Sequence, residues 1–140
     1  MINSILYLFW QSITKKYFQL KGRANRKEYI SFILVEMNII LVIDLVILLT
    51  KDLSIVFIPV TIRAIIDLIL FVPSMTIIVR RLHDLNLNGF WFLVDVPIII
   101  YCYLYDYYYI NIISGLIFGS VLLLFKGTQG TNKYGDEPKY

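Results

Sequence analysis

Apolar residues along this chain are grouped in long runs that three short polar segments separate. The first run, 29–49, reads YISFILVEMNIILVIDLVILL, and the second, 53–79, contains two prolines and two charged residues. Shorter runs follow at 90–105 and 110–125. A helix needs about 20 apolar residues to cross a bilayer core that is ~30 Å thick. The pattern therefore predicts an all-α bundle of about four transmembrane helices.

The last two runs are short for a membrane span. Because an α-helix rises 1.5 Å per residue, a helix of about 16 residues extends only ~24 Å. Aromatic rings, which settle at headgroup depth, lie at both ends of these runs and can extend the spans. They are Phe90, Trp91 and Phe92 at one end and Tyr105 and Tyr107 to Tyr109 at the other. A single re-entrant hairpin over 90–125 is the alternative.

Residues 1–20 have a different pattern. Apolar residues recur there at helical spacing, and Lys15 and Lys16 follow them; the apolar positions are Ile2, Ile5, Leu6, Phe9 and Ile13. This spacing predicts an amphipathic helix that either lies in the inner membrane interface or packs on the end of the bundle. A secretory signal peptide is not indicated, since neither a basic segment nor a small-residue cleavage site accompanies the apolar residues.

Composition and charge support a membrane protein and give it an orientation. Hydrophobic residues make up 59% and charged residues 16%, whereas a soluble domain is about half apolar and about a quarter charged. With the N-terminus in the cytoplasm, Lys51 alone lies in an outer loop, as the positive-inside rule favours. The cytoplasmic residues are then Lys15, Lys16, Lys21, Arg23, Arg26, Lys27, Arg80, Arg81, Lys126, Lys133 and Lys139. We expect a multi-pass protein of the bacterial inner membrane with both termini and the tail, 126–140, in the cytoplasm.

The first polar segment, 17–29, combines a helix start with a basic cluster. Asn25 followed by Glu28 resembles a capping box, which predicts Asn25 as the N-cap of the first span. Arg23, Arg26 and Lys27 would then surround the inner membrane surface. They suit anionic lipid, which attracts basic residues near the surface, or a more specific anionic ligand.

The second polar segment, 80–91, reads RRLHDLNLNGFW and contains the single histidine of the chain. Arg80 and Asp84 are four residues apart and share a helix face, whereas the adjacent His83 and Asp84 point in different directions. Asparagine and glycine at 86, 88 and 89 suit the left-handed backbone that ends a helix.

These features predict a charged helix end, a turn, and an interface anchor at Trp91. Arg80 and Arg81 would bind lipid phosphates or helix-terminal carbonyl groups. A ligand-binding or acid–base role for His83 is the alternative, although no serine, cysteine or second histidine lies nearby in the sequence to complete a nucleophilic set.

The third polar segment is the tail. Gly127, Gly130 and Gly135 imply tight turns. It is not a phosphate-binding loop, because it lacks the Gly-Lys-Ser/Thr sequence and the strand and helix that flank such a loop. We expect a turn-rich tail that folds against the other cytoplasmic segments.

Five charged residues fall within the predicted spans: Glu36, Asp44, Arg63, Asp67 and Asp95. Each costs at least ~2.5 kcal/mol at the bilayer centre, so each should face the bundle and find a partner. Arg63 has Asp67 four residues away and Asp44 at a similar depth. Glu36 and Asp95 lie nearer the inner end, within reach of Arg80, Arg81 or the first polar segment. The five residues either hold the helices together or form a polar path for cations or protons.

A small-residue pair lies in the last span. Gly115 and Gly119 form a Gly-x-x-x-Gly pattern, which lets two helices approach closely. The partner helix is either another span or a second copy of the protein.

Taken together, the three polar segments resemble the DUF805 family, to which the YhaH-like small bacterial inner-membrane proteins belong. The first family motif is matched by Phe18, Leu20, Gly22, Arg23, Ala24, Arg26, Glu28 and Tyr29. The second is matched by Pro73, Arg80 to Asp84, Gly89, Phe90 and Trp91, and the third by Lys126, Gly127, Gly130, Asn132, Tyr134, Gly135 and Pro138. Ile30 stands where the family usually has tryptophan, and Asn88 where it often has serine. Phe90 matches the motif as an aromatic residue, although tryptophan is more frequent there.

The resemblance implies an integral membrane protein of about four helices and no agreed activity. We therefore predict a non-enzymatic scaffold whose basic cytoplasmic face binds anionic lipid or a partner protein, with a homo-oligomer also possible. The residues expected on this face are Arg23, Arg26, Lys27, Arg80, Arg81, His83, Asp84, Trp91, Asn132 and Tyr134.

Two alternatives come from other functional classes. One is a small cation or proton channel or transporter that uses Glu36, Asp67 and Asp95. The other is an interfacial enzyme that uses His83 and Asp84. We predict no cofactor and no metal site, because one histidine and one cysteine do not make one. Nucleic-acid binding is not expected, because the basic face lies against a membrane.

Overall fold

The structure is a computed structural model that describes residues 2–138, apart from the side chains of Asp95, Tyr103, Tyr108 and Asn111. Within this part of the chain it is all helical, as predicted, and the only β-contact is an isolated bridge in the tail. The elements are α1 Ile2–Ile13, α2 Arg26–Thr50, α3 Phe57–Asp84, the 3-10 helix η1 Gly89–Val94, α4 Asp95–Leu104 and α5 Tyr108–Leu124.

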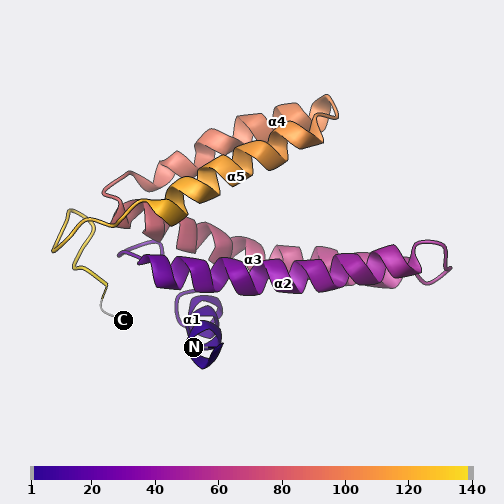
Figure 1. The fold of residues 1–140 in the computed structure, drawn as a ribbon, viewed down its shortest axis with the longest axis horizontal. Coiled ribbons are helices and arrows are strands. Elements are labelled where there is room, and N and C mark those ends of the chain that lie inside the picture. Colours follow the sequence, from indigo (N-terminus) through magenta and orange to yellow (C-terminus); the bar gives the residue numbers. More distant parts are fainter. Residues whose placement is uncertain (1, 139–140) are drawn as a thin grey trace.

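Helices α2 and α3 form a long antiparallel pair (Figure 1). They contain 25 and 28 residues and are apolar and long enough to cross a membrane. The predicted N-cap is confirmed, since the Asn25 side chain accepts the backbone N–H of Glu28 at 2.9 Å. Helix α3 begins at Phe57 rather than at 53, because residues 51–56 turn the chain and Pro59 suits a first helical turn.

Most of the surface of this pair is apolar and exposed. Leu41, Leu49 and Leu68 are 67%, 72% and 75% exposed. The buried side chains of the pair instead concentrate toward one end, around Phe32 and Ile77. Exposed apolar surface on this scale is typical of a face that another protein or a membrane covers.

The segment from η1 to α5 forms a helical hairpin that diverges from the α2–α3 pair (Figure 1). Helices α4 and α5 have 10 and 17 residues and are joined at 105–107, where Asp106 adopts a φ of 59°. At 1.5 Å per residue they extend about 15 and 26 Å, less than the bilayer core. Helices α2 and α3 are thus the candidate spans by length, and four spans or a re-entrant hairpin stay predictions.

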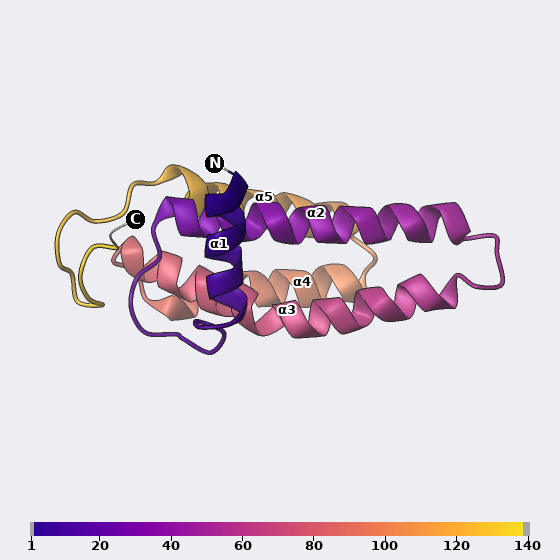
Figure 2. The same cartoon turned by 90° about the horizontal axis from the view of Figure 1, so that it is seen from below.

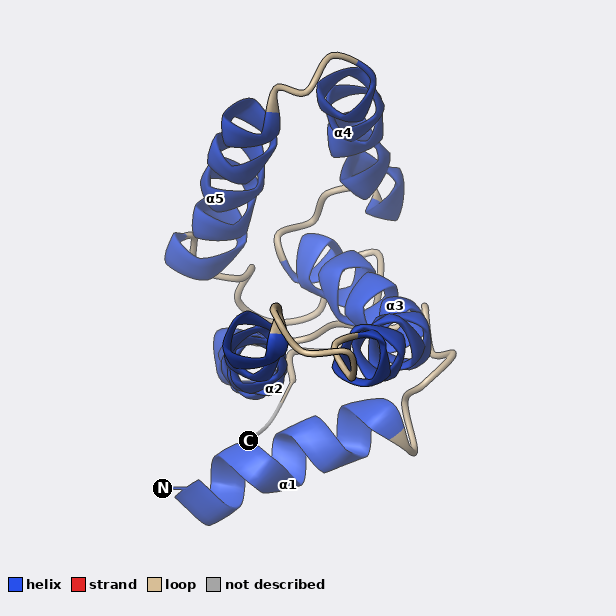
Figure 3. Cartoon of the chain, turned by 90° about the vertical axis from the view of Figure 1, so that its right-hand side faces the viewer, coloured by secondary structure: helices blue, strands red, loops and turns tan. Residues whose placement is uncertain are grey.

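Helix α1 lies across α2 and α3 instead of parallel to them (Figure 2; Figure 3). Its inner face packs on the pair, with the ring of Phe9 5.4 Å from that of Phe32. Its outer face keeps Leu6 and Trp10 51% and 63% exposed. The helix is shorter than the predicted 1–20, and it packs on the bundle while also presenting the apolar outer face of an interfacial helix.

The three polar segments meet at one end of the α2–α3 pair, which we call the polar end. It consists of residues 14–28, 80–89 and 125–138, and the tail folds over it as predicted (Figure 1). The turn between α2 and α3, which contains Lys51, lies at the opposite end of the pair (Figure 1).

Candidate functional site at the polar end

Arg23 ties the tail to the end of α3. Gly22, with a φ of 91°, turns the chain just before it, and such a backbone favours glycine. The buried Arg23 guanidinium then donates to Asp84 Oδ1 at 2.9 Å and to the carbonyl oxygens of Thr128 and Gly130. One side chain therefore joins segments more than 100 residues apart.

Arg81 and Arg26 hold the C-terminal end of α5. Arg81 is fully buried and donates to the carbonyl oxygens of Leu122 at 2.8 Å and Phe125 at 2.6 Å. Arg26 donates to Phe125 O at 2.9 Å and to Leu124 O. The last carbonyls of a helix lack intrahelical partners and carry partial negative charge. The predicted binding of helix-terminal carbonyls is thereby confirmed for Arg81.

Arg80 forms a separate buried ion pair. Its guanidinium contacts Glu28 Oε1 at 2.5 Å, and Lys16 Nζ reaches the same oxygen at 2.9 Å. Its carbonyl oxygen accepts the N–H of Ala24 at 2.9 Å. Although Arg80 shares a helix face with Asp84, that carboxylate is taken by Arg81 and Arg23 instead.

The tail closes the end of α3. Asp84 O accepts both the N–H and the hydroxyl of Thr128, at 2.8 and 3.0 Å, and His83 O accepts the Asn132 side chain at 3.0 Å. Asn86 has a φ of 61°, so the predicted left-handed residue after the helix is confirmed. Terminal carbonyls that a helix cannot satisfy alone thus receive donors from the tail.

His83 is engaged by its neighbours. Its Nδ1 lies 3.1 Å from Gly22 O, and its ring stacks on Tyr134 with centroids 3.9 Å apart. Burial lowers the pKa of His83 below its ordinary value, against the opposing effect of the Gly22 hydrogen bond. A neutral imidazole whose Nδ1–H donates to that carbonyl fits this site. These contacts give no support to an acid–base role.

Two glycines permit close packing at this end. A Cβ on Gly127 would lie 2.0 Å from Asp84 Oδ2, and one on Gly89 would lie 2.8 Å from Val79. The sequence predicts a turn at Gly127 and a helix end at Gly89, but neither glycine has a left-handed φ. Glycine is needed at both positions because a larger residue would collide with the neighbouring side chain.

The aromatic residues after α3 remain outside this network. Phe90 and Trp91 are 72% and 52% exposed, on the surface where the hairpin begins. Such exposure suits the interface anchor expected for Trp91.

The charges within the long helices form a second cluster. Arg63 donates to Asp67 at 2.9 Å and also pairs with Asp44, so both predicted pairings are confirmed. Glu36 instead accepts a hydrogen bond from Ser74, and the expectation that Arg80 or Arg81 would reach it is wrong because those side chains are engaged elsewhere. The side chain of Asp95 lies outside the described residues.

The Gly115–Gly119 pair is divided between two environments. A Cβ on Gly119 would approach the Tyr29 hydroxyl of α2 at 3.8 Å, whereas one on Gly115 would meet no atom within 4 Å. Gly119 therefore lies toward α2, and Gly115 lies in open space.

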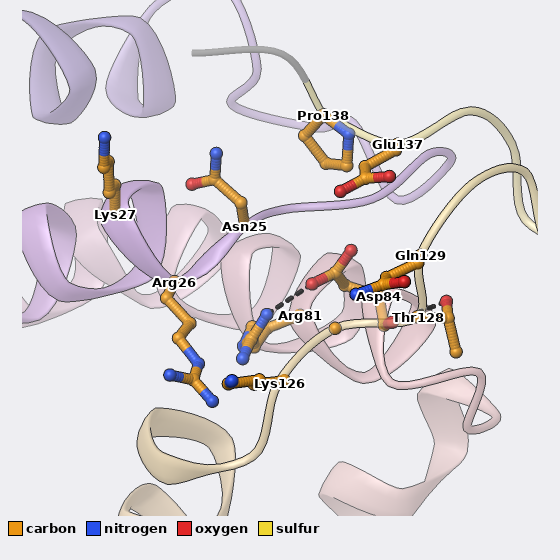
Figure 4. Close-up of a pocket in the computed structure, with 11 residues that line it drawn as sticks. Asn25, Arg26, Lys27, Arg81, Asp84, Lys126, Thr128, Gln129, Glu137 and Pro138 are labelled. Carbon is orange, nitrogen blue, oxygen red and sulfur yellow. Dashed lines mark hydrogen bonds and ion pairs between the residues drawn. The ribbon is translucent and has the colours of Figure 1, made fainter.

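A pocket of about 310 Å³ opens beside the buried arginines, and we call it the basic pocket (Figure 4). It is lined by Asn25, Arg26, Lys27, Arg81, Asp84, Lys126, Gly127, Thr128, Gln129, Glu137 and Pro138. Asp84 is already neutralised by its two arginines, and Glu137 accepts the N–H of Gly130 at 2.7 Å. Lys27 and Lys126 form no ion pair with any residue that the structure describes. The pocket therefore has an excess of positive charge.

Comparison with known proteins places these motifs in a family. The family described as "Protein of unknown function (DUF805)" matches residues 17–136, which include all three polar segments. The chain belongs to the DUF805 family. The resemblance drawn from the motifs is thus confirmed.

Two relatives from different strains share one name. The chain is 32% identical over 139 residues to "Inner membrane protein YhaI" of Escherichia coli strain K12 and of Escherichia coli O157:H7. The alignments cover 94% of this chain and 96% of each relative. No solved structure matches the chain.

The structure gives the DUF805 motifs of this chain a physical role. Every charged residue of the first two motifs contacts another motif or the end of α5: Arg23, Arg26, Glu28, Arg80, Arg81 and Asp84. Sequence reasoning missed Lys16 and Thr128, which lie outside the motif positions. Among the described residues, no three histidine, cysteine, aspartate or glutamate side chains are grouped to hold a metal ion.

Proposed function

We propose that this DUF805 protein is a non-enzymatic inner-membrane protein whose polar end faces the cytoplasm and binds an anionic headgroup in the basic pocket. The observation that carries the proposal is the pair Lys27 and Lys126, which line the pocket without an ion-pair partner among the described residues. The name of the relatives and the exposed apolar surface of α2 and α3 support the membrane location.

The two kinds of basic residue at the polar end have different tasks in this proposal. Arg23, Arg80 and Arg81 are buried and hold the chain segments together. Because they are rigidly placed, the pocket wall is formed before a ligand arrives, which lowers the entropic cost of binding. The exposed Lys27 and Lys126 then supply the attraction for an anion.

The charge asymmetry of the chain supports the orientation. Most of the lysines and arginines that the structure describes lie at the polar end, whereas the turn that contains Lys51 lies at the other end of the α2–α3 pair (Figure 1). Basic residues are retained on the cytoplasmic side of bacterial inner-membrane proteins, where anionic lipid attracts each with ~1 kcal/mol.

Titration with lipids tests this proposal. The protein in neutral detergent is mixed with phosphatidylglycerol or phosphatidylcholine, and bound lipid is counted by native mass spectrometry. Wild type should prefer phosphatidylglycerol, and the variant Lys27→Gln/Lys126→Gln should bind it about thirtyfold more weakly, since the two lysines each contribute ~1 kcal/mol. Lys51→Gln is the matched control and should bind as wild type. Equal binding by the double variant would reject the pocket.

A second candidate function rests on the Arg63 cluster. The Asp44 and Asp67 side chains are 52% and 48% exposed, although they lie within the two long apolar helices. Carboxylates at such depth are expected to mark an ion or proton path unless another protein covers them. Proton and cation flux through liposomes, with wild type beside Asp67→Asn, tests this alternative. If wild type conducts protons or cations and the substitution abolishes that flux, a channel or transporter is favoured. If liposomes with wild-type protein show no flux, this second candidate function is rejected.

A further inference from the structure

A second, apolar hollow lies between α1 and the start of α2. This groove has a volume of about 510 Å³, and Ile5, Leu8 and Ile30 contribute to its walls together with Lys27 and Ser31. Little of its lining is polar. Lys27 stands at its margin as a charged residue among these aliphatic side chains.

The groove and the basic pocket meet at Lys27, which lines both. On the pocket side of Lys27 are Arg26 and Lys126, and on the groove side are Ile5 and Ile30. A cationic hollow therefore adjoins an aliphatic one across a single residue. This juxtaposition matches a ligand that has an anionic group directly attached to a hydrocarbon chain.

We propose that the groove and the basic pocket together bind one anionic phospholipid, with its phosphate at Lys27 and one acyl chain between α1 and α2. This assignment rests on the proposed function and adds the chemical class of the ligand. The phosphate accepts a hydrogen bond from the Lys27 ammonium group and is attracted by the positive charge of Lys126, and the acyl chain packs on the aliphatic walls.

The position of α1 supports a lipid over a water-soluble phosphate. Helix α1 crosses α2 near its first turns, with Phe9 against Phe32, and its outer face exposes Leu6 and Trp10. An apolar outer face beside basic residues suits a helix at the boundary of headgroups and acyl chains. Phospholipids would be the most concentrated amphiphiles at that depth.

Two substitutions separate the acyl groove from the basic pocket. Ile30→Trp fills the groove and leaves every cation in place, whereas Lys27→Gln/Lys126→Gln removes the charges and leaves the aliphatic walls. Leu45→Trp, at a 53% exposed position of α2 outside the groove, is the matched control for adding an indole. The full-length protein in neutral detergent is titrated with dioleoyl phosphatidylglycerol, and separately with inorganic phosphate.

We expect wild type and Leu45→Trp to bind the phospholipid equally. Ile30→Trp should weaken phospholipid binding about tenfold, equivalent to ~1.4 kcal/mol, and leave phosphate binding unchanged. The double lysine variant should lose affinity for both. Melting curves establish that each variant is folded, and Ile5→Trp replaces Ile30→Trp if the latter unfolds.

The remaining outcomes identify which proposal fails. If neither groove variant changes phospholipid affinity but the lysine variant lowers it, the acyl groove is wrong and the headgroup proposal stands. If inorganic phosphate binds as tightly as the phospholipid, the ligand is a soluble anion and the lipid assignment is overturned. If the lysine variant binds phospholipid as wild type does, both proposals are rejected.

Discussion

The two charged clusters of this protein are built from the same residue types but differ in their surroundings. At the polar end, the side chains of Arg23, Arg81 and Asp84 are 1%, 0% and 4% exposed. In the apolar part of the helix pair, those of Arg63 and Asp44 are 26% and 52% exposed. The side chains of the first cluster are almost fully buried, whereas those of the second lie partly exposed on the surface of two helices.

The difference shows what each cluster contributes. Buried charges cost several kcal/mol to desolvate, which excellent geometry and extra hydrogen bonds must offset. Arg23 and Arg81 meet this requirement with backbone carbonyls from α5 and the tail, including Leu122 O and Thr128 O. The neighbouring Arg80–Glu28 pair meets it only in part, since Arg80 Nε and Nη2 and Glu28 Oε2 are buried without a hydrogen-bond partner among the described residues. The Arg63 cluster has only its own carboxylates among the described residues. We therefore expect substitutions at the polar end to lower the free energy of unfolding more than substitutions in the Arg63 cluster do.

The largest effect should come from Asp84→Asn. This substitution leaves the guanidinium groups of Arg23 and Arg81 buried without their carboxylate, and breaking a buried pair in this way costs about 3–5 kcal/mol. Unfolding of the purified protein in mixed micelles, followed by tryptophan fluorescence, measures the loss. Asp52→Asn, in the turn at the far end, is the control and should unfold as wild type. If the free energy of unfolding of Asp84→Asn equals that of wild type, the proposed difference between the two clusters is wrong.

A smaller effect is expected for added volume at the polar end. In Gly127→Ala the new Cβ would lie 2.0 Å from Asp84 Oδ2, so the tail must shift, at a cost of about 1–3 kcal/mol. Gly115→Ala adds the same atom to α5 in open space and should stabilise that helix by about 0.5–1 kcal/mol. The same unfolding assay compares them. Equal destabilisation by both alanines would contradict the packing at Gly127.

The smallest effect is expected in the Arg63 cluster. Arg63→Gln removes both ion pairs, but the Asp44 and Asp67 side chains are 52% and 48% exposed, so the substitution leaves neither carboxylate enclosed by protein. Polar contacts between membrane helices contribute only about 0.6 kcal/mol on average, so we expect a loss below ~2 kcal/mol. Adding Asp44→Asn and Asp67→Asn to Arg63→Gln should restore most of the lost free energy of unfolding. A loss as large as that of Asp84→Asn would mean that the second cluster is also essential for the fold.

The sequence predicted the elements well where apolar periodicity and capping residues determine them. The apolar run 29–49 and the capping residue Asn25 predicted where α2 lies. The four-residue spacing of Arg63 and Asp67 predicted that they pair, because such a pairing depends only on residues that are close in the chain. The start of α3 was placed four residues early, since an apolar run does not reveal where a turn ends.

The polar end could not be assembled from sequence alone. Arg80 and Arg81 are adjacent, and only the fold determines that one faces Glu28 while the other faces the end of α5. Glu28 was recognised as a capping residue, not as the partner of Arg80. The sequence predicted that the three polar segments form a basic face, but it did not predict the basic pocket, whose lining comes from residues 25–27, 81–84 and 126–138.

A double-mutant cycle between Arg23 and Asp84 tests the central claim, that the motif arginines act inside the protein. Unfolding free energies of Arg23→Gln, Asp84→Asn and the double variant are measured in the same micelles. Residues in one buried network should show a coupling of about 0.5–3 kcal/mol, and we expect the upper half of that range. Additive losses, with a coupling below about 0.5 kcal/mol, would contradict the account and return Arg23 to the surface as a ligand-binding residue.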